Sequence, residues 1–159
     1  MELQGSCYCE AVRFSVESPH PYPYMHCYCN ICRKTAGGGG FAINLGAVYA
    51  SLKVDGQDAL SVFNTASAGK SDSPGQRHFC RHCGSALWVW DPRWPELVHP
   101  FASAIDTPLP AAPERSHIFM ESKPEWVPVP TGDNDECFQH YEADMSLAAW
   151  HEARGLVSK

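Results

Sequence analysis

Seven of the eight cysteines in this chain fall into three closely spaced groups, a pattern typical of metal ligands. The groups are a C-x-C motif (Cys7, Cys9), a C-x-C-x-x-C motif (Cys27, Cys29, Cys32) and a C-x-x-C motif (Cys80, Cys83). Zn²⁺ takes four thiolates in a closed tetrahedral site. A C-x-x-C turn brings two sulfurs to one point, and Gly84 directly after it tolerates the positive φ that such turns often need. The sequence therefore predicts at least one four-thiolate zinc site.

Spacing alone leaves open which motifs share an ion. If the C-x-C motif lies on a strand, its two sulfurs point to the same face. The last two cysteines of the C-x-C-x-x-C motif can join either the C-x-x-C motif, as in a zinc ribbon, or the C-x-C motif. The separation between Cys32 and Cys80 is longer than the usual ribbon gap. The eighth cysteine, Cys137, stands alone and is expected to be inert.

The start of the chain gives no sign of export, so the thiols are expected to stay reduced. The segment from Met1 to Gly5 lacks the basic and apolar regions of a signal peptide. No stretch approaches the roughly 18 apolar residues of a membrane span. We therefore expect a cytoplasmic protein with no membrane contact, whose clustered cysteines bind metal rather than form disulfides.

The charge balance argues against a nucleic-acid partner. The chain has 12 Lys and Arg against 18 Asp and Glu, a net charge of −6 at pH 7. The densest basic pair is Arg33-Lys34, whereas a nucleic-acid surface needs many clustered basic residues. We therefore expect no nucleic-acid partner, although these two residues leave room for a small anion.

The elements that position the cysteines are predicted to be short strands within one domain, residues 1–159. Val12, Phe14 and Val16 alternate with polar residues, the period of a half-buried strand. The predicted strands are Ala11–Val16, Phe41–Leu45, Ser51–Val54, Leu60–Asn64, Ala86–Trp90 and Ile118–Glu121. The prolines of Asp106–Pro113 predict a loop. One helix is predicted at Met145–Arg154, capped by Asp144 and ended by Gly155.

Three stretches around the cysteines are similar to a known family. They are Gly5-Ser6-Cys7-Tyr8-Cys9-Glu10-Ala11-Val12-Arg13-Phe14, His26-Cys27-Tyr28-Cys29-Asn30-Ile31-Cys32-Arg33-Lys34 and Phe79-Cys80-Arg81-His82-Cys83-Gly84-Ser85-Ala86-Leu87. With Ser116-His117-Ile118-Phe119 and Ser122-Lys123-Pro124-Glu125-Trp126, the chain resembles the glutathione-dependent formaldehyde-activating enzymes, a family that includes centromere protein V. The resemblance spans nearly the whole chain.

The resemblance implies a fold and a set of zinc ligands. The implied fold is mostly β, a β-tent of small antiparallel sheets around zinc, with a short C-terminal helix. The implied ligands of a structural zinc are Cys7, Cys9, Cys80 and Cys83. Cys27, Cys29 and Cys32 would form a second site that holds a labile catalytic zinc, with its fourth position left to water or substrate. Such an open site suits catalysis, whereas a closed one suits structure.

The resemblance also implies an activity, that of a carbon–sulfur lyase similar to S-(hydroxymethyl)glutathione synthase. Its partners would be a small thiol such as glutathione and a small aldehyde such as formaldehyde, joined or separated at Cys27, Cys29 and Cys32. His26 is a candidate to move the proton, although a packed histidine is the common alternative. Another interpretation, from a different class, is a non-catalytic zinc scaffold or partner-binding module, because a shared fold does not fix a reaction.

Overall fold

The computed structural model describes residues 1–69, 72–129, 132–141 and 145–156. The chain divides into two compact units, each built from two separate segments. The first unit comprises Met1–Ser18 and Ala47–Leu109, and the second comprises Pro19–Gly46 and Pro110–Lys159. Each sulfur cluster lies within one unit, so each unit is described separately below. That residues 1–159 act as a single domain stays a prediction.

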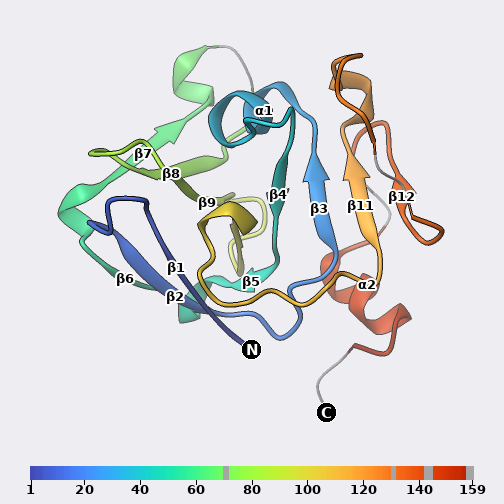
Figure 1. The fold of residues 1–159 in the computed structure, drawn as a ribbon, viewed down its shortest axis with the longest axis horizontal. Helices are drawn as coiled ribbons and strands as arrows, with labels where there is room; N and C mark the ends of the chain where they lie inside the picture. Colours follow the sequence, from blue (N-terminus) through green and yellow to red (C-terminus); the bar gives the residue numbers. More distant parts are fainter. Residues whose placement is uncertain (70–71, 130–131, 142–144, 157–159) are drawn as a thin grey trace. The chain divides into compact units, whose positions relative to one another are not determined.

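The first unit contains two antiparallel sheets (Figure 1). The three-stranded sheet has the order β1 (Glu2–Ser6), β2 (Arg13–Glu17), β6 (Lys53–Asp55). The five-stranded sheet has the order β5 (Ala47–Val48), β10 (Leu97–Pro100), β9 (Ala86–Trp90), β8 (Gln76–Cys80), β7 (Leu60–Asn64). Short 3-10 turns lie at Tyr49–Ser51, Gln57–Ala59, Ala66–Ala68 and Ala102–Ala104. The C-x-C motif follows β1 of the three-stranded sheet, and the C-x-x-C motif begins at the end of β8 in the five-stranded sheet.

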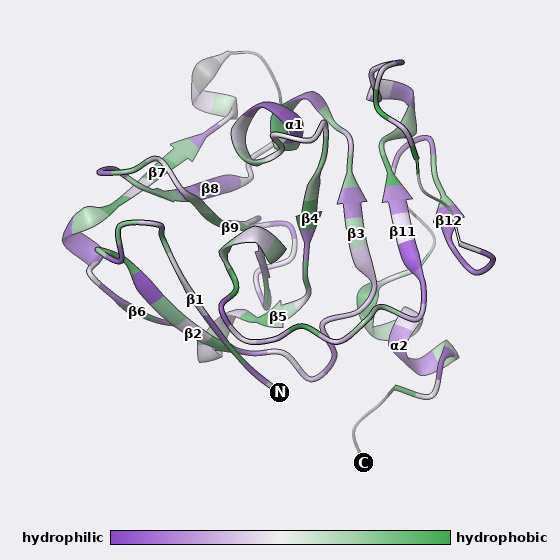
Figure 2. Cartoon of the chain, viewed as in Figure 1, coloured by the Kyte–Doolittle hydropathy of each residue, from purple (hydrophilic) through white to green (hydrophobic). Residues whose placement is uncertain are grey.

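The core of the first unit follows from the period-two pattern of β2. Phe14 and Val16 are buried, while Arg13 faces outward. Figure 2 shows this alternation as hydrophobic and hydrophilic colours along β2. The ring of Phe14 meets the buried Trp88 of β9 edge-on, with centroids 5.1 Å apart. This contact joins the two sheets through the apolar side chains of β2 and β9.

The second unit contains one mixed sheet with the order β12 (Glu136–Cys137), β11 (Arg115–Ile118), β3 (Tyr24–Cys27), β4 (Ala42–Asn44). Strands β3 and β4 are antiparallel, but β11 is parallel to both β3 and β12. This sheet is therefore mixed, whereas the two sheets of the first unit are antiparallel as expected. The physical reason is the long excursion of the chain through Ala47–Leu109 between β3 and β11, since parallel neighbours need a long connection.

Two helices and a 3-10 turn complete the second unit: α1 (Asn30–Ala36), α2 (Leu147–Ala153) and the turn Met120–Ser122. The predicted C-terminal helix is confirmed, although Ser146 caps it by accepting a hydrogen bond from the Ala149 N–H at 3.1 Å. Asp144, the predicted cap, lies outside the described residues. Gly155 ends the helix at φ 66°. Among the described residues, neither helix has the length and apolar character needed to cross a membrane.

The prediction of a mostly-β fold of small sheets is confirmed, and so is the loop from Asp106 to Pro113. The β-tent arrangement itself stays a prediction. The strand predicted at Ile118–Glu121 is wrong, because Phe119 adopts a left-handed conformation at φ 60° and ends β11. Sequence patterns missed α1 and several strands, among them β3 and β8, which deliver the cysteines.

Gly56 gives a direct test of how the first unit is packed. Its φ is 78°, and an added Cβ would lie 1.8 Å from the carbonyl oxygen of Ala11. We expect Gly56→Ala to lower the free energy of unfolding by about 2 kcal/mol or more, because left-handed strain and steric overlap add. Chemical denaturation with zinc present measures this loss.

Gly69→Ala is the matched control for that substitution. Gly69 also has a left-handed φ, of 64°, but no heavy atom of the described chain lies within 4 Å of its added Cβ. Only the conformational penalty remains there, about 1 kcal/mol. Equal losses for the two variants would contradict the close packing of Gly56 against Ala11.

Candidate metal centres

The first unit brings four cysteine sulfurs together. The Sγ atoms of Cys7, Cys9, Cys80 and Cys83 all lie within 4.8 Å of one another. Sγ of Cys9 lies 3.6 Å from that of Cys7 and 3.7 Å from that of Cys80. Cys7 and Cys80 are buried, whereas Cys9 and Cys83 are exposed. The cluster thus joins the turn after β1 to the turn after β8.

The two sulfurs of the C-x-C motif converge through a turn and not through a strand, so that expectation is wrong. Strand β1 ends at Ser6, and the N–H of Glu10 donates to the carbonyl of Cys7 at 2.9 Å. Glu10 adopts φ 59°, which completes the reversal of the chain. The tight turn swings the side chain of Cys9 back toward Cys7.

Backbone and hydroxyl donors surround this four-cysteine cluster. The N–H of Val12 donates to Sγ of Cys7 at 3.3 Å, and the N–H of His82 donates to Sγ of Cys80 at 3.4 Å. The Ser85 hydroxyl lies 3.2 Å from Sγ of Cys83. Hydrogen bonds from Ser85 are the largest cause that lowers the pKa of Cys83 to about 5. Such donors offset the negative charge of a four-thiolate site.

The second unit brings three more cysteine sulfurs together. The Sγ atoms of Cys27, Cys29 and Cys32 lie within 4.8 Å of one another. Cys27 ends β3, Cys29 is the N-cap of α1, and Cys32 lies in the first turn of that helix. Cys27 and Cys32 are buried, whereas Cys29 is half-buried. The cluster therefore consists of two buried cysteines and one that is half-buried.

The helix cap explains how this three-cysteine cluster forms. Sγ of Cys29 accepts a hydrogen bond from the Cys32 N–H at 3.3 Å, which is the role a serine or aspartate usually fills. Hydrogen bonds from the thiols of Cys27 and Cys32 are the main cause that lowers the pKa of Cys29 to about 2. The same interactions raise the pKa of Cys27 well above its usual value. Within the cluster, the negative charge is therefore favoured on Cys29 rather than on Cys27.

His26 lies in a packed aromatic layer next to the three-cysteine cluster. Its ring stacks on Phe41 with centroids 4.8 Å apart and lies 4.9 Å from the ring of His117. Burial is the largest cause that lowers the pKa of His26 to about 4. Its Nδ1 has no hydrogen-bond partner among the described residues. The histidine is therefore neutral at pH 7, with one ring nitrogen left unpaired.

An ion pair between Arg115 and Asp135 lies next to His117 of this aromatic layer. The carboxylate of Asp135 accepts from Nε of Arg115 at 2.8 Å and from the backbone N–H of Arg115 at 2.7 Å. Burial alone would raise the pKa of Asp135, but the hydrogen bonds from Arg115 and Gly132 lower it from 3.8 to about 2. Since the folded pKa is the lower one, this pair stabilises the protein above about pH 4. That stabilisation is lost as the pH falls toward 2.

Replacing Asp135 with asparagine tests this pH dependence. Near pH 6 we expect Asp135→Asn to lower the free energy of unfolding by about 1–2 kcal/mol, after allowance for solvent screening. The difference from the parent should shrink as the pH falls from about 4 toward 2. The labile zinc is removed from both proteins beforehand, so that a difference in its affinity does not enter the comparison. A difference that is constant with pH would contradict the assigned role.

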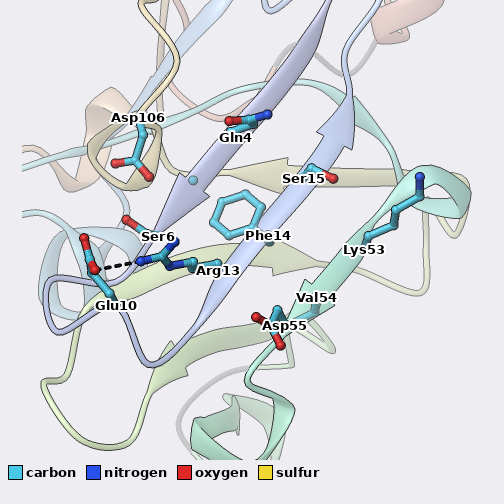
Figure 3. Close-up of a pocket in the computed structure, with 11 residues that line it drawn as sticks. Gln4, Ser6, Glu10, Arg13, Phe14, Ser15, Lys53, Val54, Asp55 and Asp106 are labelled. Carbon is cyan, nitrogen blue, oxygen red and sulfur yellow. Dashed lines mark hydrogen bonds and ion pairs between the residues drawn. The ribbon is translucent and has the colours of Figure 1, made fainter.

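Apart from these clusters, the first unit carries a hollow of about 480 Å³ lined mainly by residues of β1, β2 and β6. Figure 3 shows the residues that line it, among them Arg13, which points toward Glu10 and pairs with it at 2.7 Å. Charges of both signs line the hollow, and no cysteine does. The hollow is therefore separate from both sulfur clusters.

The donor atoms fit zinc in both clusters. All seven are cysteine sulfurs, the soft ligands that zinc accepts in structural and catalytic sites. No other group of three or more metal-ligating side chains occurs among the residues that the structure describes. Cys137 belongs to neither cluster and lies exposed on β12, opposite His117 of β11. Sequence analysis missed Ser85, His117 and Asp135 because their contacts depend on the folded chain.

Comparisons with known proteins identify the family of the chain. Residues 2–122 match the family described as glutathione-dependent formaldehyde-activating enzyme. A Halomonas elongata protein, provisionally named a glutathione-dependent formaldehyde-activating enzyme, is 58% identical over 156 residues, which cover 98% of each chain. The crystal structure of a Rhodobacter sphaeroides protein superposes with a TM-score of 0.54 at 25% identity, covering 69% of this chain and 92% of that one. The chain therefore belongs to the glutathione-dependent formaldehyde-activating enzyme family.

Proposed function

We propose that the protein is a zinc-dependent enzyme of the carbon–sulfur lyase type, which joins a glutathione-like thiol to a small aldehyde such as formaldehyde, or reverses that step. The observation that carries the proposal is the contrast between the two clusters. Four sulfurs complete a tetrahedral site by themselves, whereas three leave one position for a reacting molecule. Family membership supports the same thiol and aldehyde.

Each cluster has its own part in this proposal. Cys7, Cys9, Cys80 and Cys83 hold a structural zinc, and Cys27, Cys29 and Cys32 hold a second, more labile one. A zinc ion in the three-cysteine cluster supplies Lewis acidity for thiol or carbonyl activation, weakened by the charge of three thiolates. Cys27 and Cys32 fix two ligands in the interior, and the half-buried Cys29 marks the side from which a substrate approaches.

The reaction itself needs no oxidant or reductant. The thiol sulfur bonds to the carbonyl carbon, the π bond of the carbonyl opens, and the thiol proton ends on the carbonyl oxygen. His26 is our proposed carrier of that proton, because it adjoins Cys27 and its Nδ1 is unpaired among the described residues. We place this chemistry in the cytoplasm, where seven ligand thiols stay reduced.

Exchange NMR on glutathione and formaldehyde tests the proposal directly. The exchange rate is first measured without protein, and catalysis then shows as a rate that rises linearly with the enzyme concentration. We expect this increase for zinc-loaded protein and its loss after chelation. No acceleration with glutathione or any other small thiol would instead favour a non-catalytic zinc scaffold.

A further inference from the structure

Tyr28, which separates the ligands Cys27 and Cys29, is fully buried and anchored at both ends. Its backbone N–H donates to the carbonyl of Ile118 at 3.0 Å. Its hydroxyl lies 2.9 Å from Nδ1 of His117. Both anchors come from β11, which runs beside β3 in Figure 1. The turn that separates the two cysteines is therefore tied to a neighbouring strand by main chain and side chain together.

His117 is itself held by the next segment along the sheet. The side chain is fully buried, and its Nε2 lies 3.7 Å from the carboxylate of Asp135, whose own side chain is 4% exposed. This distance is longer than a hydrogen bond, and Nε2 has no hydrogen-bond partner among the described residues. The negative charge of Asp135 still attracts a proton to Nε2, which is the tautomer in which Nδ1 is an acceptor. Nδ1 is then the acceptor for the Tyr28 hydroxyl. Asp135 thus favours, through its charge, the tautomer in which His117 accepts from the Tyr28 hydroxyl.

The same carboxylate also fixes the strand that carries His117. Asp135 accepts from the backbone N–H and the side chain of Arg115, two residues earlier on β11. The N–H of Phe138 donates to the carbonyl of His117 at 2.8 Å from the other side. These contacts restrain His117, and the hydrogen bond to His117 restrains the side chain of Tyr28 in turn.

We propose that Asp135, His117 and Tyr28 form a positioning chain that sets the geometry of the three-cysteine cluster. This inference rests on the proposed function, in which that cluster binds zinc. None of the three residues touches substrate. They act through Tyr28, whose placement fixes Cys27 at the end of β3 and Cys29 at the N-cap of α1. Mutation of residues that orient metal ligands in this way typically lowers metal affinity by about 10- to 100-fold.

Tyr28→Phe removes only the hydroxyl and is the first variant to test. We expect it to weaken binding of the labile zinc about 10- to 100-fold, measured by competition with a chromophoric chelator, while the tight zinc is unchanged. The Co²⁺-substituted protein should also show a shifted ligand-field spectrum at the three-cysteine site. The labile ion is assigned by its absence from Cys29→Ser.

Tyr24→Phe is the matched control, at the start of β3, whereas Tyr28 directly follows that strand. The Tyr24 hydroxyl donates to the carbonyl of Pro110 at 2.6 Å, away from the proposed chain. Its removal should leave the affinity of both zinc ions unchanged. Loss of labile zinc from both variants alike would overturn the proposal, because any lost tyrosine hydroxyl would then have the same effect.

Asp135→Asn tests the other end of the positioning chain. It keeps the proposal testable if Tyr28→Phe fails to fold. It should weaken the labile zinc in the same direction, and combined with Tyr28→Phe it should add less than its separate effect. A parent that binds two zinc ions, with unchanged affinity in these variants, overturns the positioning chain alone. A parent that binds a single ion contradicts the proposed function as well.

Discussion

Replacing Cys29 with serine is expected to lower the rate of thiol–aldehyde adduct formation by at least about 100-fold, because it removes a ligand of the proposed catalytic zinc. The fold should survive the change. Sγ of Cys29 caps α1 by accepting from the Cys32 N–H, and serine is a preferred residue at that position. Exchange NMR gives the rate, and metal analysis should find one zinc per chain where the parent has two.

Cys137→Ser is the control for this substitution. Cys137 is an exposed cysteine outside both clusters, so its replacement should leave rate and zinc content as in the parent. If Cys29→Ser retained the parental rate, the reaction would not take place at the three-cysteine cluster. Loss of both zinc ions from Cys29→Ser would show instead that the fold itself depends on that cysteine.

Cys80→Ser is expected to have the largest effect on stability. The side chain is fully buried at the end of β8, and the three sulfurs that remain hold zinc poorly. Binding of a structural zinc contributes roughly 10 kcal/mol or more to folding, which is comparable to the whole stability of a typical domain. We therefore expect the variant to lose the tight zinc and the cooperative unfolding transition. Circular dichroism during thermal unfolding measures the second loss.

The control again is Cys137→Ser, which should melt like the parent because it removes an exposed sulfur that contacts no cluster. A Cys80→Ser protein that kept its tight zinc and its melting temperature would show that the four-cysteine cluster does not bind the structural ion. The two cysteine variants together therefore separate the structural role from the catalytic one.

The cysteine motifs and the period-two strands could be read from the sequence because both are local patterns. The alternation that includes Phe14 and Val16 predicted β2, and the apolar run Ala86–Trp90 predicted β9. The choice of which cysteines share a cluster needed the family resemblance, since spacing left alternatives open. The folded chain brings together the two sets that the resemblance implied.

The parts that could not be predicted depend on contacts distant in sequence. Strand β11 has mostly hydrophilic residues, as Figure 2 shows, and forms a strand because Asp135 and β3 hold it in place. Helix α1 is only seven residues long and is capped by Cys29, and cysteine is not among the residues preferred at helix N-caps. Tyr28 gave no sign of its role, because its bond to His117 requires the parallel register of two strands.

The most direct test of the account is the zinc content of the reduced protein, before and after mild chelation, with thiol–aldehyde adduct formation measured in each state. We predict two zinc ions per chain, one of which the chelator removes together with the activity, and restoration of activity when zinc is returned. A single tightly held zinc and no activity with any small thiol would contradict the account and identify the protein as a non-catalytic zinc scaffold.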